Sequence, residues 1–325
     1  MADGKVPRRT FLTAGVAGVA SAALGTARFV PDSAMGSSPP DPLSLRERGN
    51  SGETLQLGVA SYSLRNFPRD KAIAMVQALG ARYINLKSVH LPFELSPAEL
   101  AAARQGIEAA GLVIVGGGVI TFEHDTDADV EKYFAYAKGA GMPLITVHAA
   151  PALLPRIERF AKQYDIKVAI HNHGPEDKNF PSPYDALKHI RNMDRHIGLC
   201  IDIGHTVRTG TDVVRAVADA GPRVLDLHLK DLRDLTAKGS QCIVGEGAIP
   251  IPQIFQQLEA IGFGGYANLE YEIDADDPLP GMKQSFAYMR GALAGLSAAG
   301  RHDHHPCPEE RGCPSRGRRC RVATS

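Results

Sequence analysis

The most constraining feature of this chain is a repeated alternation of short apolar runs with amphipathic segments, which continues from residue 55 to residue 296. The apolar runs are rich in Val and Ile, which is typical of buried strands, and the amphipathic segments have the length and period of helices. Predicted strands span residues 55–62, 83–87, 112–115, 144–148, 167–171, 197–203, 224–229 and 266–271. Predicted helices span residues 69–79, 98–110, 127–139, 153–164, 183–191, 211–220, 251–261 and 278–296.

Eight strand–helix units determine the fold class that we expect. Strands that alternate with helices form a parallel sheet, and eight units favour its closure into a single α/β domain, a (β/α)8 or TIM barrel. The alternative is an open, doubly wound sheet, which would need a glycine-rich phosphate loop after the first strand. That loop has the sequence SYSLRN at residues 61–66 and contains no glycine. We therefore predict the barrel, with its domain at residues 53–298.

The N-terminal segment, residues 1–30, has the features of an export signal. Arg8 and Arg9 precede the sequence Thr10-Phe11-Leu12 and a weakly apolar run rich in Ala and Gly. This pattern is typical of a twin-arginine signal. The run is shorter than the ~20 residues that a membrane span needs. We expect export through the twin-arginine machinery, a periplasmic location, and no stable membrane span after processing.

Composition changes again on either side of the predicted barrel. Residues 31–52 are rich in Pro, Ser and Gly, which predicts a linker. Residues 299–325 hold three of the five cysteines and a His and Asp run at 302–305, but their spacing fits no zinc-finger pattern. We predict a disordered tail there. The odd number of cysteines gives no disulfide framework, and Cys200 lies in an apolar run, where we expect it to be a core residue.

The charge balance excludes one class of partner. The chain has 36 basic and 36 acidic residues and no Trp. Zero net charge provides no field that would attract nucleic acid, and few aromatic side chains are present on which bases could stack. We therefore expect a small-molecule substrate and no nucleic acid.

Polar side chains gather where the predicted strands end, which is where TIM barrels place their active sites. They are Lys87, His90, His148, His171, Asn172, His173, Asp202, His205, His228, Lys230, Glu270 and Glu272. Mixed imidazole and carboxylate ligands suit Mn, Fe, Co or Zn better than Ca. On the seventh strand Asp226, His228 and Lys230 alternate with leucines, so we expect these three to point into the barrel. The sequence therefore predicts a divalent-metal site at the barrel mouth.

Five segments in this order resemble the xylose isomerase-like barrels, the sugar phosphate isomerase/epimerase group, over roughly residues 55–295. They are VAIHNHGPED at 168–177, GLCIDIGHTVRTG at 198–210, DLHLKD at 226–231, VGEGAIPIPQIFQQL at 244–258 and ANLEYE at 267–272. In that family a divalent ion, often Mn, is held by a carboxylate from the fifth strand, an Asp from the sixth, a His from the seventh and a Glu from the eighth.

The resemblance assigns three of these metal ligands to Asp202, His228 and Glu270. The fifth-strand position is His171 instead of Glu, and a neutral imidazole can still bind a metal. We expect Mn as the ion, with Zn, Fe, Co and Mg as alternatives. The epimerases of this group use two metal-bound Glu residues as an acid/base pair, so His171 changes one of the two proton carriers.

The resemblance further implies proton abstraction from a keto-sugar through an enediolate. Glu270 is the expected base, His171 the second proton carrier and Lys230 the group that stabilises the developing oxyanion. Expected substrate contacts are Lys87, His90, His148, Asn172, His173, His205 and Glu246. We expect a sugar isomerase or epimerase. A lyase that acts on a keto-glycoside by the same proton abstraction, a non-catalytic sugar-binding barrel, and a homo-oligomer all remain open.

Overall fold

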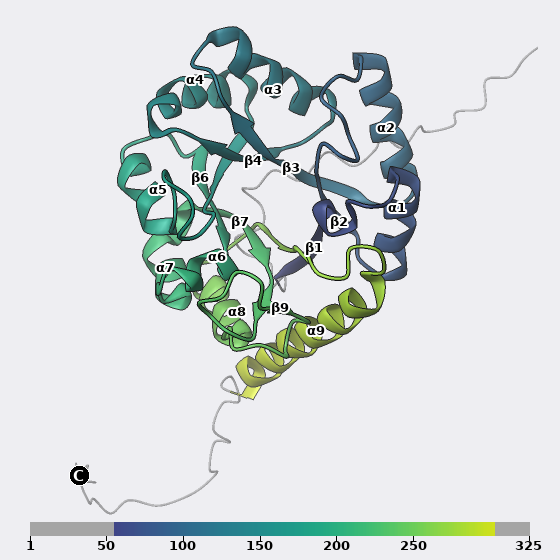
Figure 1. Cartoon of the computed structure of the whole chain (residues 1–325), viewed down its shortest axis with the longest axis vertical. Helices are drawn as coiled ribbons and strands as arrows, with labels where there is room; N and C mark the ends of the chain where they lie inside the picture. Colours follow the sequence, from purple (N-terminus) through teal and green to yellow (C-terminus); the bar gives the residue numbers. More distant parts are fainter. Residues whose placement is uncertain (1–54, 303–325) are drawn as a thin grey trace, which may run out of the picture. The chain divides into compact units, whose positions relative to one another are not determined.

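The alternation of strands and helices closes into a barrel in a computed structural model, which describes residues 55–302 of the chain (Figure 1). Eight parallel strands pair in the order β1, β10, β7, β6, β5, β4, β3, β2, and β2 also pairs with β1. The expected (β/α)8 fold is therefore confirmed. The predicted signal segment, the linker and the tail beyond residue 302 lie outside the described residues.

The elements follow each other along the chain much as the alternation predicts. The barrel strands are β1 (Gln56–Ala60), β2 (Tyr83–Leu86), β3 (Val113–Phe122), β4 (Leu144–Ala149), β5 (Lys167–His171), β6 (Ile197–Asp202), β7 (Val224–Leu229) and β10 (Tyr266–Leu269). The α-helices are α1 (Arg69–Ala78), α2 (Pro97–Ala109), α3 (Asp127–Gly139), α4 (Leu154–Tyr164), α5 (Pro183–Ile190), α6 (Ile203–Arg208), α7 (Val213–Ala220), α8 (Ile251–Ala260) and α9 (Leu279–His302). Short 3-10 helices are η2 (Ser61–Leu64), η3 (Pro151–Leu153) and η4 (Gly221–Arg223).

Strand β3, helix α6 and the strands β8 and β9 differ from the sequence prediction. Strand β3 continues to Phe122 because its second half pairs with β4, with Ile120 beside Val147 and Phe122 beside Ala149. The extra helix α6 begins directly at the end of β6. A small antiparallel ribbon of β8 (Asp231–Leu232) and β9 (Gln241–Cys242) follows β7. Both additions lie beside the C-terminal ends of the strands, where they extend the barrel mouth.

One carboxylate fixes the loop between β9 and α8. Asp231 accepts hydrogen bonds from its neighbour's backbone and from the backbone N–H groups of Gly245, Gly247 and Ile249, at 2.9–3.1 Å. A buried carboxylate that accepts several N–H donors is strongly held in place. The Asp in the sequence HLKD is therefore a structural residue that shapes the mouth.

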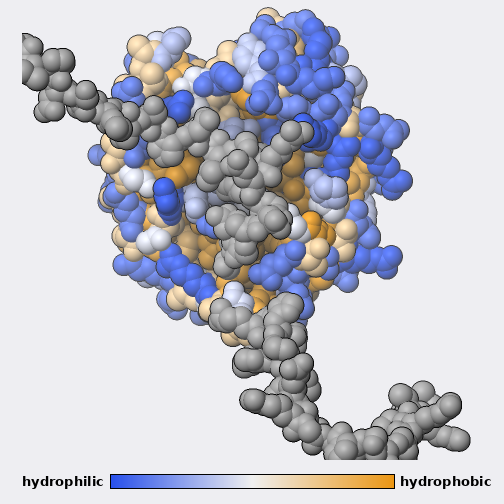
Figure 2. Space-filling model, turned by 180° about the vertical axis from the view of Figure 1, so that it is seen from behind, coloured by the Kyte–Doolittle hydropathy of each residue, from blue (hydrophilic) through white to orange (hydrophobic). Residues whose placement is uncertain are grey.

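The apolar core fills the layer between the strands and the surrounding helices, and includes fully buried Ile145, Leu227, Phe255 and Met282. Each such side chain contributes roughly 1.5–3 kcal/mol on burial. Cys200 is buried with no exposed area, as expected of a core residue. On the face drawn in Figure 2, hydrophilic residues form most of the outer rim and hydrophobic residues gather toward the centre. Among residues 55–302, no helix is both long and apolar enough to cross a membrane.

Candidate metal centre

The C-terminal ends of four strands bring together the four side chains that the sequence predicts as metal ligands. Strand register sets His171 beside Cys200 on β5 and β6, and Asp202 beside His228 on β6 and β7. Glu270 follows β10 directly. All four side chains are buried, and one ligand atom of each lies within 4.8 Å of the others: they are His171, Asp202, His228 and Glu270. We call this set the four-ligand cluster.

The spacing within the four-ligand cluster fits a small divalent ion. His171 Nε2 lies 3.0 Å from His228 Nδ1 and 3.5 Å from Asp202 Oδ2, and His228 Nδ1 lies 3.2 Å from Glu270 Oε2. Ligand atoms around a tetrahedral ion with bonds of about 2.0–2.2 Å are roughly 3.3–3.5 Å apart. Asp202 Oδ2 is buried without a hydrogen bond of regular geometry, and Lys230 Nζ lies 3.0 Å from it. Two imidazoles and two carboxylates are ligands that divalent transition metals bind.

A buried ammonium already lies at the edge of this cluster. Lys230 Nζ is 3.0 Å from Asp202 Oδ2, 3.0 Å from Glu270 Oε2 and 2.5 Å from Glu272 Oε2. Burial opposes the charge of Lys230, but these three carboxylates outweigh it and raise its pKa well above the usual value. Gly204 makes room for the lysine stem, because a Cβ there would lie 2.6 Å from Lys230 Cγ. Lys230 is thus a fixed positive charge at the site.

The protonation states of the cluster differ from residue to residue. Burial lowers the pKa of His171 to about 3, so its imidazole is neutral and offers a lone pair. Burial also disfavours the cation of His228, but the carboxylates of Glu270, Asp226 and Asp202 outweigh it and raise its pKa to about 9. The pKa of Asp202 and that of Glu270 lie well below their usual values, because neighbouring imidazoles and Lys230 overcome burial. A metal ion that bound here would therefore displace a proton from His228.

A polar layer lies directly beneath the four-ligand cluster, inside the barrel. Asp226 accepts hydrogen bonds from Asn268 Nδ2 (2.8 Å), Thr146 Oγ1 (3.1 Å) and Asn85 Nδ2 (3.3 Å). Burial raises the pKa of Asp226. Its Oδ2 atom lies 3.9 Å from His228 Nε2, a buried nitrogen with no hydrogen-bond partner. Asp226 is positioned to orient the His228 ring, as carboxylates behind metal-binding histidines do.

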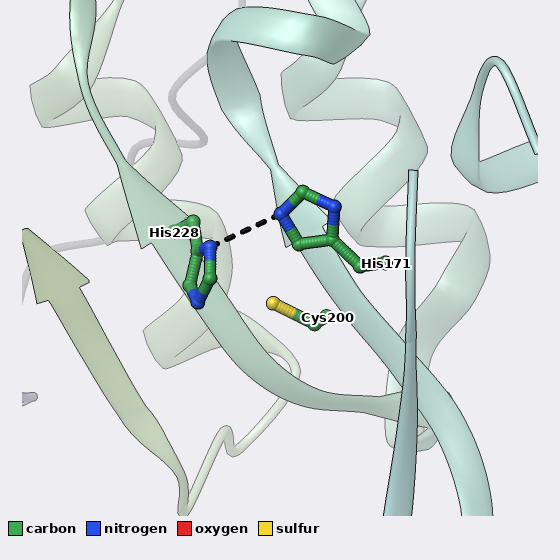
Figure 3. Close-up of side chains that lie close together, drawn as sticks. All are labelled: His171, Cys200 and His228. Atoms are coloured by element: carbon green, nitrogen blue, oxygen red, sulfur yellow. Dashed lines mark hydrogen bonds between the residues drawn. The ribbon is translucent and has the colours of Figure 1, made fainter. Parts of the chain in front are cut away.

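Cys200 provides a second possible ligand set, drawn in Figure 3. Its sulfur lies beside the rings of His171 and His228, and one ligand atom of each is within 4.8 Å of the others. Burial raises the pKa of the Cys200 thiol well above its usual value. The protonated thiol is a poor metal ligand, since the thiolate is the binding form. The oxygen and nitrogen set of the four-ligand cluster is therefore the better candidate.

A pocket of about 230 Å³ opens beside Lys230, and its lining includes His205, Gln241 and Glu272. This is smaller than the roughly 300–1,000 Å³ of pockets that take drug-sized ligands, so it suits a small molecule. The Lys87 ammonium lies over the Tyr62 ring and donates to the Val119 carbonyl at 3.2 Å, and burial lowers its pKa.

The other predicted substrate contacts fall into three groups. Asn172 accepts the Asp202 N–H and donates to Thr206 Oγ1, so it braces the end of β6. His148 and His173 lie together beside Asp177, next to the four-ligand cluster. His90 and Glu246 form the third group, and their contacts lie outside the four-ligand cluster.

The surroundings of His90 and Glu246 explain why they lie apart from the site. The His90 ring contacts Ser61 Oγ and the carbonyl oxygens of Leu64 and Phe67, which fixes the turn after β1. Glu246 pairs with Arg233 at the surface, 2.6 Å away. In these contacts neither His90 nor Glu246 touches the four-ligand cluster.

Sequence reasoning missed Asp177 as a site residue. It lies four positions after His173, in a loop that turns back toward the barrel through Gly174, whose φ is +85°. The only local signal is the His-x-x-x-Asp spacing after a strand end. This spacing is not part of a periodic pattern. The loop turns back toward the barrel because the His173 N–H donates to the Phe180 carbonyl and the Gly174 N–H donates to the Pro181 carbonyl.

Known proteins resemble this chain in both sequence and structure. The rhizopine catabolism protein MocC of Rhizobium meliloti is 25% identical over 138 residues, 38% of this chain and 42% of that protein. The inosose dehydratase of Clostridium beijerinckii is 23% identical over 248 residues, 68% of this chain and 78% of that enzyme. The match therefore spans less than half the length of MocC.

A solved structure and a family profile agree on the fold. The structure of an L-ribulose 3-epimerase superposes with a TM-score of 0.63 at 15% identity and covers 78% of this chain and all of that one, a likeness that shows the fold alone. The profile of the xylose isomerase-like TIM barrel matches residues 73–292. Because this match covers more than half of the sequence, the chain belongs to the xylose isomerase-like TIM barrel family.

Proposed function

We propose that this protein is a metal-dependent sugar isomerase or epimerase that acts on a keto-sugar through an enediolate. The observation that carries the proposal is the four-ligand cluster at the barrel mouth, with Glu270 and Lys230 in direct contact beside a small pocket. In this arrangement Glu270 can accept a proton from carbon, while the adjacent Lys230 ammonium stabilises charge that develops on the carbonyl oxygen.

The residues of the site take distinct roles in this proposal. A divalent ion, with Mn first and Zn, Fe, Co or Mg as alternatives, would be held by His171, Asp202, His228 and Glu270 and would act as a Lewis acid toward the substrate oxygens. Glu270, ionised in the structure, accepts the proton from carbon. Lys230 stabilises negative charge that develops on the oxygen. The second proton is returned by His171 or by His205, whose ring centroids lie 6.0 Å apart.

A lyase is the second candidate, and His171 is the residue that favours it. With imidazole in place of the family's fifth-strand carboxylate, the site lacks the symmetric pair of bases that inverts a centre. The similarity to an inosose dehydratase supports the same alternative. Proton removal beside a carbonyl by Glu270, followed by loss of a β-substituent, would use the same side chains.

Solvent exchange separates these candidates. The chain, loaded with Mn, is incubated in D2O with ketohexoses and, in parallel, with a keto-inositol, and the products are followed by NMR. Deuterium beside the carbonyl with a rearranged or inverted sugar supports the isomerase or epimerase. Deuterium with a dehydrated product supports the lyase. Binding without exchange of any of these compounds would contradict the enzyme proposal and leave a sugar-binding barrel.

The base assignment has its own variant. Glu270→Gln should slow exchange by about 10²–10⁴-fold, because the amide cannot accept the proton. The matched control is Glu259→Gln on the exposed side of α8, which should exchange at the rate of the wild type. If Glu270→Gln exchanges normally at saturating Mn, another group is the base.

A further inference from the structure

A second group of ligand-type side chains lies beside the four-ligand cluster and shares no residue with it. His148 lies on β4, and His173 and Asp177 lie in the loop that follows β5. One ligand atom of each lies within 4.8 Å of the other two. We call this set the outer triad. The ring of His173 also contacts that of His171, with centroids 4.4 Å apart, so the two groups are direct neighbours.

Asp177 anchors the outer triad. Its side chain is only 4% exposed, and its Oδ1 atom accepts the Asn179 N–H at 2.8 Å. Its own N–H donates to the Gly174 carbonyl at 3.0 Å, which closes the turn. The other oxygen, Oδ2, is buried and lies 3.1 Å from His148 Nε2 without a hydrogen bond of regular geometry. The loop thus aims a rigidly held carboxylate at two histidines.

The distances match those around a metal ion. Asp177 Oδ2 lies 3.1 Å from His148 Nε2 and 3.5 Å from His173 Nδ1. Bonds of about 2.0–2.2 Å at tetrahedral angles set ligand atoms roughly 3.3–3.5 Å apart. The outer triad therefore has the spacing of a three-ligand metal site.

Hydrogen bonding within the triad does not account for all its polar atoms. His148 Nε2 lies 3.2 Å from Asp177 Oδ1 and 3.1 Å from Oδ2, so one proton on this nitrogen is shared between the two oxygens. His173 Nδ1 is buried without a hydrogen-bond partner, 3.5 Å from Asp177 Oδ2. An unpaired buried polar atom costs about 1–3 kcal/mol. A cation bound to His173 Nδ1 and to the carboxylate would remove this penalty.

We propose that His148, His173 and Asp177 bind a second divalent transition-metal ion next to the four-ligand cluster. Two imidazoles and one carboxylate suit Zn or Fe(II), and three protein ligands leave coordination positions open. The side chains of His148 and His173 are 25% and 37% exposed, so these positions are accessible to water or to a hydroxyl group of a small substrate. The site does not depend on the proposed isomerase activity.

Metal counting tests the proposal in the full chain. The protein is stripped with a chelator, titrated with Zn²⁺ or Co²⁺, and analysed for bound metal and for Co²⁺ visible absorption. Asp177→Asn should lose one ion per chain relative to the wild type, with affinity at that site weakened by about 100-fold or more. Asp202→Asn should lose a different ion and keep the one that depends on Asp177. Ions held by residues outside 55–302 cancel in these differences.

Controls keep the outcomes distinct. Asp165→Asn alters a surface carboxylate that pairs with His196 and should leave the metal count unchanged. If Asp177→Asn is unstable, His148→Gln at a partly exposed position gives a second test. This variant should also lose one ion per chain. If both triad variants are folded by circular dichroism and bind as many ions as the wild type, the triad holds a water molecule or only hydrogen bonds, and the proposal is wrong. Loss of the Asp202-dependent ion alone would support the proposed function and overturn this one.

Discussion

Histidine and aspartate side chains lie at both ends of β5 and β6, and they pair differently at the two ends. At the C-terminal ends, His171 and Asp202 are almost fully buried, 3.5 Å apart and not hydrogen-bonded to each other. At the N-terminal ends, His196 donates from Nδ1 to Asp194 at 2.6 Å and from Nε2 to Asp165 at 3.0 Å. Asp165 is 90% exposed.

The pKa values of the two histidines shift in opposite directions at these two ends. Burial lowers the pKa of His171 to about 3. Burial also disfavours the His196 cation, but hydrogen bonds to Asp165 and Asp194 outweigh it and raise its pKa. The N-terminal end satisfies both ring nitrogens of His196 with carboxylates. At the C-terminal end Lys230 pairs with the carboxylates, but His171 Nδ1 and His228 Nε2 have no hydrogen-bond partner. This is the separation of stability from function that TIM barrels show between their two faces.

The largest expected effect comes from a variant that removes the charge balance at the C-terminal end. Lys230→Met should cost about 3–5 kcal/mol of unfolding free energy in the metal-free protein, because three carboxylates lose their buried ammonium. Urea denaturation in chelator measures this loss. Saturating Mn should reduce it, because the ion supplies positive charge to Asp202 and Glu270.

The matched control is Lys188→Met, which removes an exposed lysine paired with Asp185 on α5. Exposed pairs of this kind contribute about 0.2–1 kcal/mol. An equal loss for Lys230→Met with and without Mn would show that the ammonium and the ion do not share the same carboxylates.

A smaller effect should come from the layer under the site. Asp226→Asn should weaken metal binding by about 10–100-fold, because it removes the carboxylate behind His228. Metal titration of the stripped protein measures the change. Thr146→Val removes one hydrogen bond to Asp226 and keeps the charge, so it should bind metal more tightly than Asp226→Asn. Equal affinity in both variants would mean that hydrogen bonding alone, and not the charge of Asp226, orients His228.

The comparison between the two ends also shows what the sequence can predict. Strand order and strand ends follow from local apolar patterns, so the fold and the positions of His171, Asp202 and His228 were predictable. Which atoms remain unpaired was not, because that depends on side chains from distant strands that meet across the barrel, such as Asn85 and Asn268 on Asp226.

The same limit explains the individual differences in the site. His90 follows β2 and His148 lies near the end of β4. The His90 ring, however, contacts two residues of η2, Ser61 and Leu64. Asp177 belongs to a loop whose return is set by backbone pairing, which leaves no periodic pattern in the sequence. Sequence position therefore predicts which residues reach the barrel mouth, and tertiary hydrogen bonds decide which of them are free to bind a ligand.

The smallest expected effect concerns the N-terminal end. The folded-state pKa of His196 is raised above its unfolded value, so the stabilisation from its ion pairs is fully present below about pH 6.5 and is lost as the pH rises through the folded-state pKa. His196→Gln should therefore destabilise the protein by less than about 1 kcal/mol near pH 5.5, where Asp165 and Asp194 are still ionised, and by less near pH 9. Urea denaturation at both pH values measures the difference. A cost that is the same at both pH values would mean that hydrogen-bond geometry, and not charge, holds the N-terminal ends of β5 and β6 together. The N-terminal end would then not be stabilised by paired charges, as the comparison between the two ends requires.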